Sequence, residues 1–529
     1  MANVTIDNLS VTVPDGSTVL QAARQAGIDI PTLCYDERYA PNHSCLVCLV
    51  KINGAPRLVP SCATKVADGM QIESETAEVR EARKTAFELL LADHAGDCVA
   101  PCQGVCPAKM DIPRMLDHIA AGRLNEALRT VKEAIALPAV LGRICPELCE
   151  KGCRRGEIDA PVAICKMKRH VADEDLATGA PWTPTPRPST GKRIAIVGAG
   201  PAGLAAAYYL QGLGHACTIH DEHPQPGGAL RYAVPESELP RDVLDAEIAI
   251  TLRMGATFRG DWQLGRDGTI DGLASQFDAV LIAIGPADAA KAKSFGLPTA
   301  GRGVAVDKQT LMTPHQGVFV AGAVITPYKH SVRAVADGRT AAVSIHNYLT
   351  GETIAAGKAY SVHVGKLRER ELTDAMTLSV DAPRQEADAG TGAIPPVLAT
   401  LEASRCLHCQ CDADRSCTLR KYAAEYGANQ RRFQVPRREL GRVEVHPGIV
   451  YERTKCIACG LCIQVATQAG EVLGLTYIGR GFDIRIGVPL SQGGQNALVR
   501  CASECIEVCP TGALSYQLRN PLVPASQKA

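Results

Sequence analysis

Hydrophobic and polar positions in the middle of the chain predict a strand, a helix and a second strand in succession. Residues 194–197 form a short apolar run that is typical of a buried parallel strand, and residues 204–213 have the composition of a buried helix. A second apolar run at residues 216–220 ends in Asp221. Parallel strands joined by a crossover helix belong to an open α/β sheet. The pattern therefore predicts an α/β domain in this part of the chain.

The N-terminal part of the chain has a different pattern. Residues 4–6 and 9–13 predict a hairpin, and residues 18–26 predict a short helix. Residues 77–92 form an amphipathic helix, and a further helical stretch covers residues 112–137. We therefore expect a small domain with strands, followed by a helical one.

Two stretches break these patterns. Residues 176–191 are rich in proline, threonine and glycine, which predicts a linker. Residues 351–400 lack a clear period, and residues 381–396 within them are rich in alanine, glycine and proline, so we expect a connector on the surface. At 529 residues the chain is long enough for three or more domains.

The charge balance and the cysteine content narrow the function. The 56 lysine and arginine residues equal the 56 aspartate and glutamate residues, which gives no case for binding nucleic acid or an anionic membrane. We find no signal segment and no apolar run of about 18 residues, so we expect a cytoplasmic protein without a membrane span. The 22 cysteines lie in tight clusters. In a reducing compartment such clusters indicate metal binding and not disulfides.

A glycine-rich turn joins the first central strand to its helix. Residues 198–203 read Gly-Ala-Gly-Pro-Ala-Gly, a pattern whose glycines let the backbone approach a pyrophosphate at a helix N-terminus. The acidic residue at the end of the second strand suits the two ribose hydroxyls. The predicted dinucleotide contacts are Gly198, Gly200, Pro201, Ala202, Gly203 and Asp221.

Four cysteines of the N-terminal domain have the spacing of an iron-sulfur ligand set. Cys34, Cys45 and Cys48 belong to one loop, and Cys62 comes from a following strand. The arrangement resembles plant-type ferredoxins, in which four thiolates hold a two-iron cluster. The alternative is a zinc site, since zinc also takes four thiolates. The spacing resembles the N-terminal domain of the large peripheral iron-sulfur subunit of respiratory complex I and of related hydrogenases and formate dehydrogenases.

Two further cysteine runs flank the helical stretch, one before it and one after it. Here the sequence resembles the N-terminal domain of the glutamate synthase small subunit and of dihydropyrimidine dehydrogenase. That family folds its two runs together so that they share clusters. The resemblance implies two four-iron clusters, one held by Cys98, Cys102 and Cys153 and the other by Cys106, Cys145 and Cys149.

Each of these two clusters lacks one ligand in the sequence. His94 stands where the family places another cysteine, and the complex I subunit carries a histidine-ligated four-iron cluster at the corresponding point. An imidazole ligand would change the potential of the cluster; the alternative is a surface histidine at the end of a helix. For the other cluster the resemblance implies Cys165, with a free buried cysteine as the alternative.

The residues after the second central strand resemble the same glutamate synthase family. Residues 227–235 match a stretch that lines the isoalloxazine side of FAD there, and residues 317–342 match the closing FAD motif. At one position the family has an aspartate that contacts the ribityl chain, and this chain has an alanine, which removes a hydrogen bond. The resemblance implies FAD as the nucleotide, with further contacts from Gly227, Gly228, Leu230, Arg231, Gly322 and Ala323.

One domain of that family is missing. In the family, the strand that matches residues 278–285 is followed by a second dinucleotide fold, which binds NADPH. Here only residues 286–316 separate Gly285 from Gly317, and they contain no G-x-G-x-x-G motif. A dinucleotide fold needs more chain than this. We therefore expect the nicotinamide domain to be absent.

A third cysteine group precedes a basic helix. Cys406, Cys409, Cys411 and Cys417 are enough ligands for one four-iron cluster or one zinc ion. We favour the cluster, because every neighbouring site is of the redox type.

The C-terminal domain follows the bacterial ferredoxin pattern, in which three thiolates come from one turn and the fourth from a distant Cys-Pro pair. Ala466 stands where a two-cluster ferredoxin has another cysteine, so we expect one four-iron cluster, as in the matching part of the complex I subunit. Its predicted ligands are Cys456, Cys459, Cys462 and Cys509. Cys217, Cys501 and Cys505 are left over, and we interpret them as ordinary buried thiols.

Together these features predict a multi-domain α/β protein with one FAD, one 2Fe-2S cluster and about four 4Fe-4S clusters. The expected parts are a two-iron ferredoxin-like β-grasp domain (residues 1–79), a helical domain with two four-iron clusters (80–175), a linker (176–191), a Rossmann-like FAD domain without the NAD(P) insertion (192–350), a connector (351–400), a cysteine-rich cluster segment (401–440) and a ferredoxin-like domain with one four-iron cluster (441–529).

Five clusters around one flavin suit electron relay, so we nominate no catalytic acid, base or nucleophile. We expect an electron-transfer subunit of a multi-subunit NAD-linked oxidoreductase, similar to the flavin subunits of bifurcating transhydrogenase, hydrogenase or formate dehydrogenase complexes. The alternatives are a stand-alone NAD(P)H-dependent flavin oxidoreductase and a flavin-free cluster relay. The resemblance implies as partners an FMN- and NAD-binding subunit like the complex I flavoprotein subunit, a small two-iron thioredoxin-like subunit, and a terminal formate dehydrogenase, hydrogenase or ferredoxin.

Overall fold

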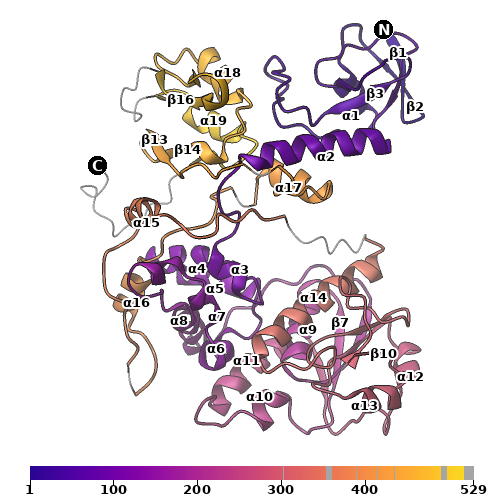
Figure 1. Ribbon diagram of the computed structural model, residues 1–529. Helices are drawn as coiled ribbons and strands as arrows, with labels where there is room; N and C mark the ends of the chain where they lie inside the picture. Colours follow the sequence, from indigo (N-terminus) through magenta and orange to yellow (C-terminus); the bar gives the residue numbers. More distant parts are fainter. Residues whose placement is uncertain are drawn as a thin grey trace. The chain divides into compact units, whose positions relative to one another are not determined.

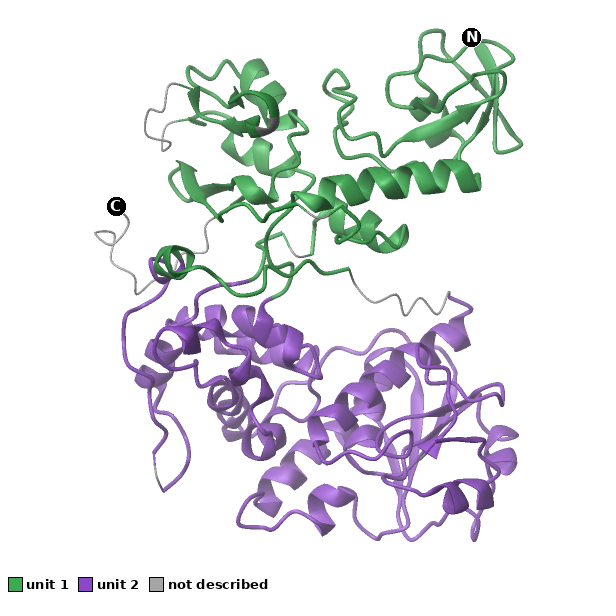
Figure 2. Cartoon of the chain, viewed as in Figure 1, with its two compact units in different colours: residues 1–99, 358–374, 410–519 green, residues 100–357, 375–409, 520–529 purple. Residues whose placement is uncertain are grey.

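The computed structural model (Figure 1) describes residues 1–301, 303–352, 360–388, 390–413, 415–433, 435–489 and 497–516. They form two compact units, which Figure 2 shows in different colours. Unit 1 contains the chain up to Val99, a short piece that ends at Asp374, and the described residues from Gln410 to Tyr516. Unit 2 contains the remaining described residues. Most of the chain between the two halves of unit 1 therefore belongs to another unit.

The N-terminal part of unit 1 is a five-stranded sheet with one helix. Its strands, in spatial order, are β2 (Leu9–Val13), β1 (Ala2–Ile6), β5 (Gln71–Glu73), β3 (Leu49–Ile52) and β4 (Val59–Pro60), and its helix is α1 (Val19–Gln25). The predicted hairpin is confirmed, because Asp7 and Asn8 both have the positive φ that a two-residue turn needs. Thr18 and Gln21 form a capping box at the start of α1.

The rest of unit 1 joins segments that are far apart in sequence. Helix α2 has the predicted bounds and packs on α17, where the Phe87 ring contacts those of Tyr422 and Tyr426. Strands β13, β14 and β17 form one sheet, and β15 pairs with β16. The bounds are α2 (Ala77–Ala92), α17 (Thr418–Glu425), β13 (Arg442–His446), β14 (Ile449–Glu452), η2 (Arg453–Lys455), α18 (Leu461–Gln468), β15 (Thr476–Ile478), η3 (Gly481–Asp483), β16 (Arg485–Gly487), α19 (Ala502–Glu507) and β17 (Leu514–Tyr516).

Unit 2 begins with a group of short helices. The helical stretch predicted as one piece is two helices, α4 and α5, because Gly122 has a positive φ between them. Helix α16 packs on α4 and α8. The bounds are α3 (Pro101–Val105), α4 (Ile112–Ala120), α5 (Leu124–Lys132), α6 (Pro138–Ile144), α7 (Leu148–Lys151), η1 (Arg154–Glu157), α8 (Ile164–Ala177) and α16 (Pro396–Ala403).

The stretch predicted as a surface connector contains two helices, α15 (Glu369–Met376) and α16. Glu402 on α16 is fully buried and accepts hydrogen bonds from the backbone N–H of Ala163 (2.7 Å) and from Arg405 (2.9 Å). Glu402 lies just after the predicted stretch, and Ile394 and Ala399 within the stretch are themselves buried, so the end of the stretch is part of the interior of unit 2.

The α/β part of unit 2 contains an all-parallel sheet with the strand order β12-β9-β6-β7-β8. Helices α9 and α14 pack against each other beside this sheet (Figure 1). The bounds are β6 (Arg193–Val197), α9 (Pro201–Gly212), β7 (Ala216–His220), α10 (Ala229–Tyr232), α11 (Arg241–Arg253), β8 (Thr257–Arg259), α12 (Ile270–Ala274), β9 (Ala279–Ile282), β12 (Val318–Val320) and α14 (Ser331–Thr350).

Only small elements occupy the described residues between β9 and β12. They are helix α13 (Ala289–Ser294) and the hairpin of β10 (Thr299–Ala300) and β11 (Gly303–Val304). The predicted absence of a second dinucleotide fold fits these elements, since such a fold needs several strands of its own. Among the described residues, no helix is both long enough and apolar enough to span a bilayer.

A buried carboxylate joins the helical part of unit 2 to its α/β part. Glu247 on α11 is 1% exposed, and its oxygens accept the backbone N–H groups of Ala139 (2.9 Å) and Val140 (2.8 Å) at the start of α6. Burial raises the pKa of Glu247 to about 7, although these N–H groups and the charges of Lys132 and Arg143 act to lower it. The folded chain therefore holds the Glu247 proton more tightly than the unfolded chain does.

We expect the stability of unit 2 to fall as the pH rises from 4.5 to about 7, because over this range the unfolded chain has already lost the Glu247 proton. The shift sets an upper limit of roughly 3 kcal/mol on the loss. Glu247→Gln removes the titration, so the difference in free energy of unfolding between the two proteins should change across this range and stay level above it. Denaturant unfolding at a series of pH values measures the difference. A difference that stays constant across the range would contradict the prediction.

Candidate iron-sulfur sites and dinucleotide site

The four cysteines of the N-terminal domain lie in two close pairs. Cys34 Sγ is 3.2 Å from Cys45 Sγ, and Cys48 Sγ is 3.5 Å from Cys62 Sγ. All four residues are buried. A tetrahedral metal ion that binds thiolates at about 2.3 Å holds two of them about 3.8 Å apart, so each pair suits one ion. Four thiolates divided between two ions are the ligand set of a two-iron cluster.

Each pair contains one thiol that ionises readily. The hydrogen bond with Cys45 lowers the pKa of Cys34 to about 5, and the hydrogen bond with Cys62 lowers the pKa of Cys48 to about 7. The same contacts raise the pKa values of Cys45 and Cys62. Because the thiolate is the form that binds metal, the site is prepared for its ligand role.

A small cavity in the C-terminal part of unit 1 is lined by four more cysteines. Three belong to α18 or the loop before it, and the fourth precedes Pro510; they are Cys456, Cys459, Cys462 and Cys509. Burial raises the pKa values of Cys456 and Cys459, and neighbouring thiols of the same group raise them further. The grouping matches the predicted four-iron ligand set.

The spare thiols of this domain lie beside the cavity. Cys505 Sγ is 3.7 Å from the carbonyl oxygen of Cys462, and 3.9 Å from Cys501 Sγ. Both cysteines are buried, as their interpretation as ordinary core thiols requires.

A third group in unit 1 surrounds a buried lysine. The charge of Lys455 acts to lower the pKa values of His94, Cys98 and Cys411. Burial raises the pKa of Cys417 to about 12, with a contribution from the neighbouring thiols of Cys411 and Cys98. Cys98 Sγ accepts the backbone N–H of Val362 (3.3 Å). These four candidate ligands come from both halves of unit 1.

His94 has the properties of a ligand in this group. It is 9% exposed, and its Nδ1 atom has no hydrogen-bond partner among the described residues. The backbone of Lys455 bonds the ring, which leaves Nδ1 for another partner. Burial and the charge of Lys455 lower the pKa of His94 to about 4, so the imidazole is neutral at pH 7 and can bind a metal ion. The interpretation as a surface histidine does not fit this burial.

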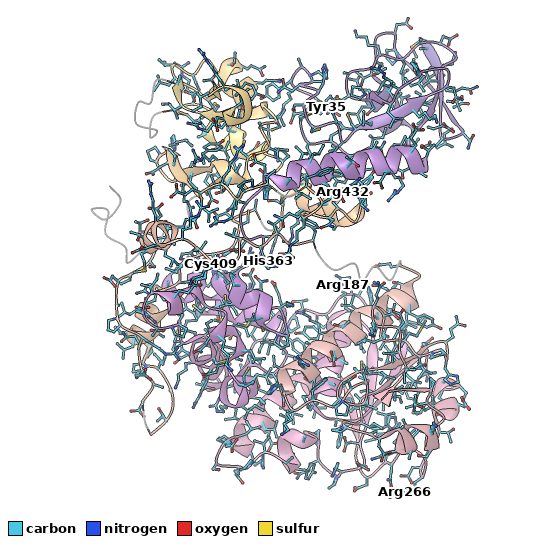
Figure 3. The ribbon with its side chains drawn as sticks, viewed as in Figure 1. Tyr35, Arg187, Arg266, His363, Cys409 and Arg432 are labelled. Atoms are coloured by element: carbon cyan, nitrogen blue, oxygen red, sulfur yellow. The ribbon has the colours of Figure 1, made fainter. Side chains whose placement is uncertain are left out.

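A fourth group lies in the helical part of unit 2. A small cavity there is lined by Cys102, Cys153, Cys406 and Cys409. Burial raises the pKa of Cys102 far above its usual value, and the other three thiols raise it further. Cys406 and Cys409 follow α16, which packs on α4 and α8 and so brings both thiols to this cavity. Cys409 is labelled in Figure 3.

The structure thus divides these cysteines differently from the sequence interpretation. Cys98 was expected beside Cys102 and Cys153, but it belongs to unit 1. Cys406 and Cys409 were expected beside Cys411 and Cys417, but the boundary between the units falls directly after Cys409. The reason is the insertion of unit 2, which separates ligands that are adjacent in sequence and joins ligands that are far apart.

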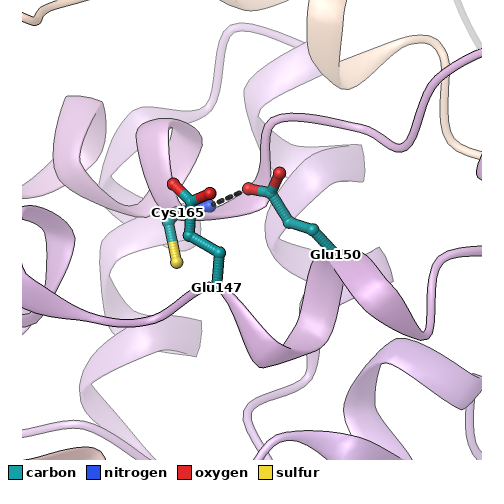
Figure 4. A group of neighbouring side chains, drawn as sticks. All are labelled: Glu147, Glu150 and Cys165. Carbon is teal, nitrogen blue, oxygen red and sulfur yellow. Dashed lines mark hydrogen bonds between the residues drawn. The ribbon is translucent and has the colours of Figure 1, made fainter.

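A fifth group, in unit 2, has the predicted members. Cys106, Cys145, Cys149 and Cys165 all raise the pKa of the buried Lys168, against the lowering effect of its burial. Lys168 Nζ is 3.8 Å from Cys165 Sγ. Cys165 is held in place by Glu150, whose Oε1 accepts its backbone N–H at 3.1 Å (Figure 4). A buried ammonium group beside four thiols offsets part of the negative charge that a bound cluster brings.

The two ferredoxin-type sites of unit 1 are in direct contact through the protein. Asn42, in the loop of the first site, donates from Nδ2 to the carbonyl oxygen of Cys459 in the second (2.6 Å). The charge of the Cys34 thiolate helps to raise the pKa of Cys459. The second site also contacts the histidine group, because Cys417 Sγ lies 3.8 Å from the carbonyl oxygen of Pro510. Three of the five groups therefore form a continuous series within unit 1.

A cavity of about 360 Å³ opens at the carboxyl ends of β6 and β7 in unit 2. This is where open α/β sheets bind nucleotides. Most of the predicted contacts line the cavity, namely Gly198, Gly200, Pro201, Ala202, Asp221, Gly228, Gly322 and Ala323. Gly203, Gly227, Leu230 and Arg231 do not line it; Leu230 is fully buried, and Arg231 bonds to the Pro226 carbonyl oxygen (2.7 Å) and pairs with Asp245.

The glycine turn fits a dinucleotide. A Cβ atom at Gly198 would clash with the carbonyl of Ala283, and one at Gly203 would clash with the carbonyl of Gly198. At Gly200 the space beyond the backbone is open to 4 Å, at the N-terminus of the twelve-residue helix α9. Two glycines therefore let the turn pack tightly and the third leaves room for a phosphate group.

Two side chains of the cavity were missed by the sequence interpretation. His220 ends β7, and Trp262 follows β8. A histidine at the end of an otherwise apolar strand was the only signal in the sequence. Ala323 is buried and lines the cavity, as expected for the position that lacks the aspartate of the related family.

Four parts of the chain match known protein families. Residues 1–77 match the 2Fe-2S iron-sulfur cluster binding domain, and residues 73–180 match the 4Fe-4S domain II of dihydropyrimidine dehydrogenase. Residues 165–338 match the pyridine nucleotide-disulphide oxidoreductases, and residues 446–515 match the ferredoxin-like domain of NADH-quinone oxidoreductase subunit 3. The matches confirm the predicted fold class.

Three relatives share part of the sequence. The NADP(+)-dependent formate dehydrogenase subunit beta of Moorella thermoacetica is 42% identical over 207 residues, which are 35% of this chain and 29% of that protein. The NADPH-Fe(3+) oxidoreductase subunit beta of Geobacter sulfurreducens is 40% identical over 188 residues, 35% of this chain and 28% of that protein. The NAD-dependent dihydropyrimidine dehydrogenase subunit PreT of Escherichia coli is 39% identical over 207 residues, 38% of this chain and 50% of that protein.

The chain spans at most half the length of these relatives. All three are subunits of oxidoreductases by name, and all four matching families are of iron-sulfur or flavin type. The chain therefore joins in one polypeptide four segments that match a 2Fe-2S domain, a dihydropyrimidine dehydrogenase-type 4Fe-4S domain, a pyridine nucleotide-disulphide oxidoreductase domain and a ferredoxin-like domain.

Proposed function

We propose that this chain is an electron-transfer subunit of a multi-subunit NAD-linked oxidoreductase. The observation that carries the proposal is the arrangement of nineteen cysteines and His94 in five groups of four ligands. Three of these groups form a continuous series in unit 1. Such a series suits the transfer of electrons through the protein.

Each group has a proposed cofactor. The paired thiols Cys34 with Cys45 and Cys48 with Cys62 hold a 2Fe-2S cluster, and the other four groups each hold a 4Fe-4S cluster. The cavity at the glycine turn binds FAD. When bound, the clusters transfer single electrons, and the flavin takes two electrons and releases them one at a time.

The residues around the clusters have supporting roles. Asn42 keeps the first two sites of unit 1 at a fixed separation through its bond to the Cys459 carbonyl. Burial of most ligands keeps water away from the clusters, which is one of the factors that set their potentials. Lys168 and Lys455 each place a buried positive charge beside one group.

Partner subunits complete the proposed complex. We propose that electrons pass between the two-iron domain and an FMN- and NAD-binding subunit, directly or through a small two-iron thioredoxin-like subunit. The terminal partner is a formate dehydrogenase, a hydrogenase or a ferredoxin. The names of the relatives, which include a formate dehydrogenase subunit, support this choice.

An anaerobic titration tests the proposal. We expect neither NADH nor NADPH to bleach the flavin and clusters of the isolated, flavin-reconstituted chain, because the described residues between β9 and β12 are too few for a nicotinamide fold, whereas dithionite bleaches them. Rapid bleaching by either nucleotide would show a stand-alone NAD(P)H-dependent enzyme. Clusters that bleach in a chain that takes up no flavin would show a flavin-free relay, the result that Ala323 would favour.

A further inference from the structure

His220 is a buried polar residue without a partner. It is 2% exposed, and neither ring nitrogen has a hydrogen-bond partner among the described residues. An unsatisfied buried polar group costs stability, so such groups in native proteins call for an explanation. The ring lines the cavity at the carboxyl end of β7. A ligand in the cavity can therefore supply the missing partner.

Trp262 stands next to this histidine. The two ring centroids are 4.6 Å apart with an interplanar angle of 55°. The backbone N–H of Trp262 donates to the carbonyl oxygen of Asp221 (2.9 Å). A Cβ atom at Gly268 would clash with the indole ring, so the ring occupies space that is open only because residue 268 is a glycine. Trp262 thus has a fixed position at the wall of the cavity.

The order of groups in a nucleotide places its base at these two rings. The glycine turn at the start of α9 suits the phosphates, and Asp221, at the end of the next strand, suits the ribose hydroxyls. His220 precedes Asp221, and Trp262 bonds to its carbonyl. The base follows the ribose on the side away from the phosphates. His220 and Trp262 are then the aromatic residues nearest to the base.

We propose that His220 and Trp262 form an adenine site, in which the indole face of Trp262 packs on the base and His220 hydrogen-bonds to its edge. The proposal rests on the dinucleotide site proposed above. Burial, with a smaller effect of Arg259, lowers the pKa of His220 to about 4, so the ring has one N–H donor and one acceptor at pH 7. The edge of adenine likewise carries an amino donor beside ring acceptors.

This site selects ligands that contain adenosine. FAD and NADH carry the adenosine diphosphate group, whereas FMN ends at its phosphate. The chain should therefore bind FAD much more tightly than FMN, and His220 should contribute to that difference. If His220 served only to pack the interior of unit 2, replacing it would change the affinities for FAD and FMN equally.

Flavin binding by the cluster-loaded chain tests the proposal. Equilibrium dialysis of the flavin-depleted protein gives the Kd values for FAD, FMN, NADH and ADP. We expect His220→Phe, which keeps a ring of similar shape, to raise the Kd for FAD and for ADP about tenfold, the effect of one lost hydrogen bond, and to leave the Kd for FMN unchanged. His220→Gln, which keeps a donor and an acceptor, should recover part of the affinity. His315→Phe, an exposed histidine of the same unit, is the matched control.

The possible results separate this proposal from the proposed function. Equal effects of His220→Phe on FAD and FMN, or none on FAD, would overturn the adenine site while leaving an FAD-dependent relay in place. If the wild-type chain binds neither flavin but binds ADP with the same dependence on His220, the adenine site stands and the flavin role falls. Failure to bind ADP and FAD alike would overturn both. NADH binding as tight as FAD binding, lost in His220→Phe, would keep the adenine site and reassign its ligand.

Discussion

Replacing both Cys406 and Cys411 by alanine is expected to remove two four-iron clusters from the chain, one from each unit. Cys406 lines a cavity in unit 2 with Cys102, Cys153 and Cys409. Cys411 belongs to unit 1, where the charges of Cys411 and Cys98 help to raise the pKa of Cys417. Each single variant should therefore lose about four irons, and the double variant about eight. If the two cysteines served one cluster, as their spacing in the sequence suggests, the double variant would lose no more iron than either single one.

Iron and acid-labile sulfide analysis, with electron paramagnetic resonance of the reduced protein, measures these losses. Cys217→Ala is a suitable control, because Cys217 is a buried thiol outside the five groups and should keep the full iron content. The double variant also tests folding, since circular dichroism should show that the parallel sheet of unit 2 remains. Iron losses that are equal in the single and double variants would refute the grouping that the structure shows.

Replacing His94 by cysteine is expected to lower the reduction potential of one cluster in unit 1 by on the order of 100 mV. The neutral imidazole would be exchanged for a negatively charged thiolate, and exchange of two cysteines for two histidines in other clusters raises the potential by several times that amount. The buried Nδ1 atom, free of any partner among the described residues, is the proposed iron ligand. A redox titration followed by electron paramagnetic resonance measures the shift.

The comparison with other sites makes this result specific. The potentials of the clusters in unit 2 should not change, because His94 belongs to unit 1. His446→Cys, a change of the same kind elsewhere in unit 1, should leave all potentials as they are. Unchanged potentials and spectra in His94→Cys would show that His94 does not bind iron, and a fourth ligand for Cys98, Cys411 and Cys417 would have to be sought elsewhere.

The local motifs of this chain could be predicted from its sequence. In the ferredoxin-type loop with Cys34, Cys45 and Cys48, and in the loop with Cys456, Cys459 and Cys462, most ligands lie within a few residues of one another. Short spacings restrict where the chain can place its thiols, so such motifs report their ligand sets directly. The glycine turn and the strand that ends in Asp221 are local in the same sense, and the structure has them as predicted.

The sequence by itself therefore determined which residue types bind metal and nucleotide, and which strands and helices carry them. Only the tertiary structure decided which distant candidate ligands lie together, because the insertion of unit 2 between Val99 and Gln410 separates Cys98 from Cys102 and Cys409 from Cys411. It also decided the surroundings of His94 and His220, whose burial depends on segments far away in sequence. Spacing limits the reach of neighbouring residues, but it carries no information about contacts that form when separate segments pack together.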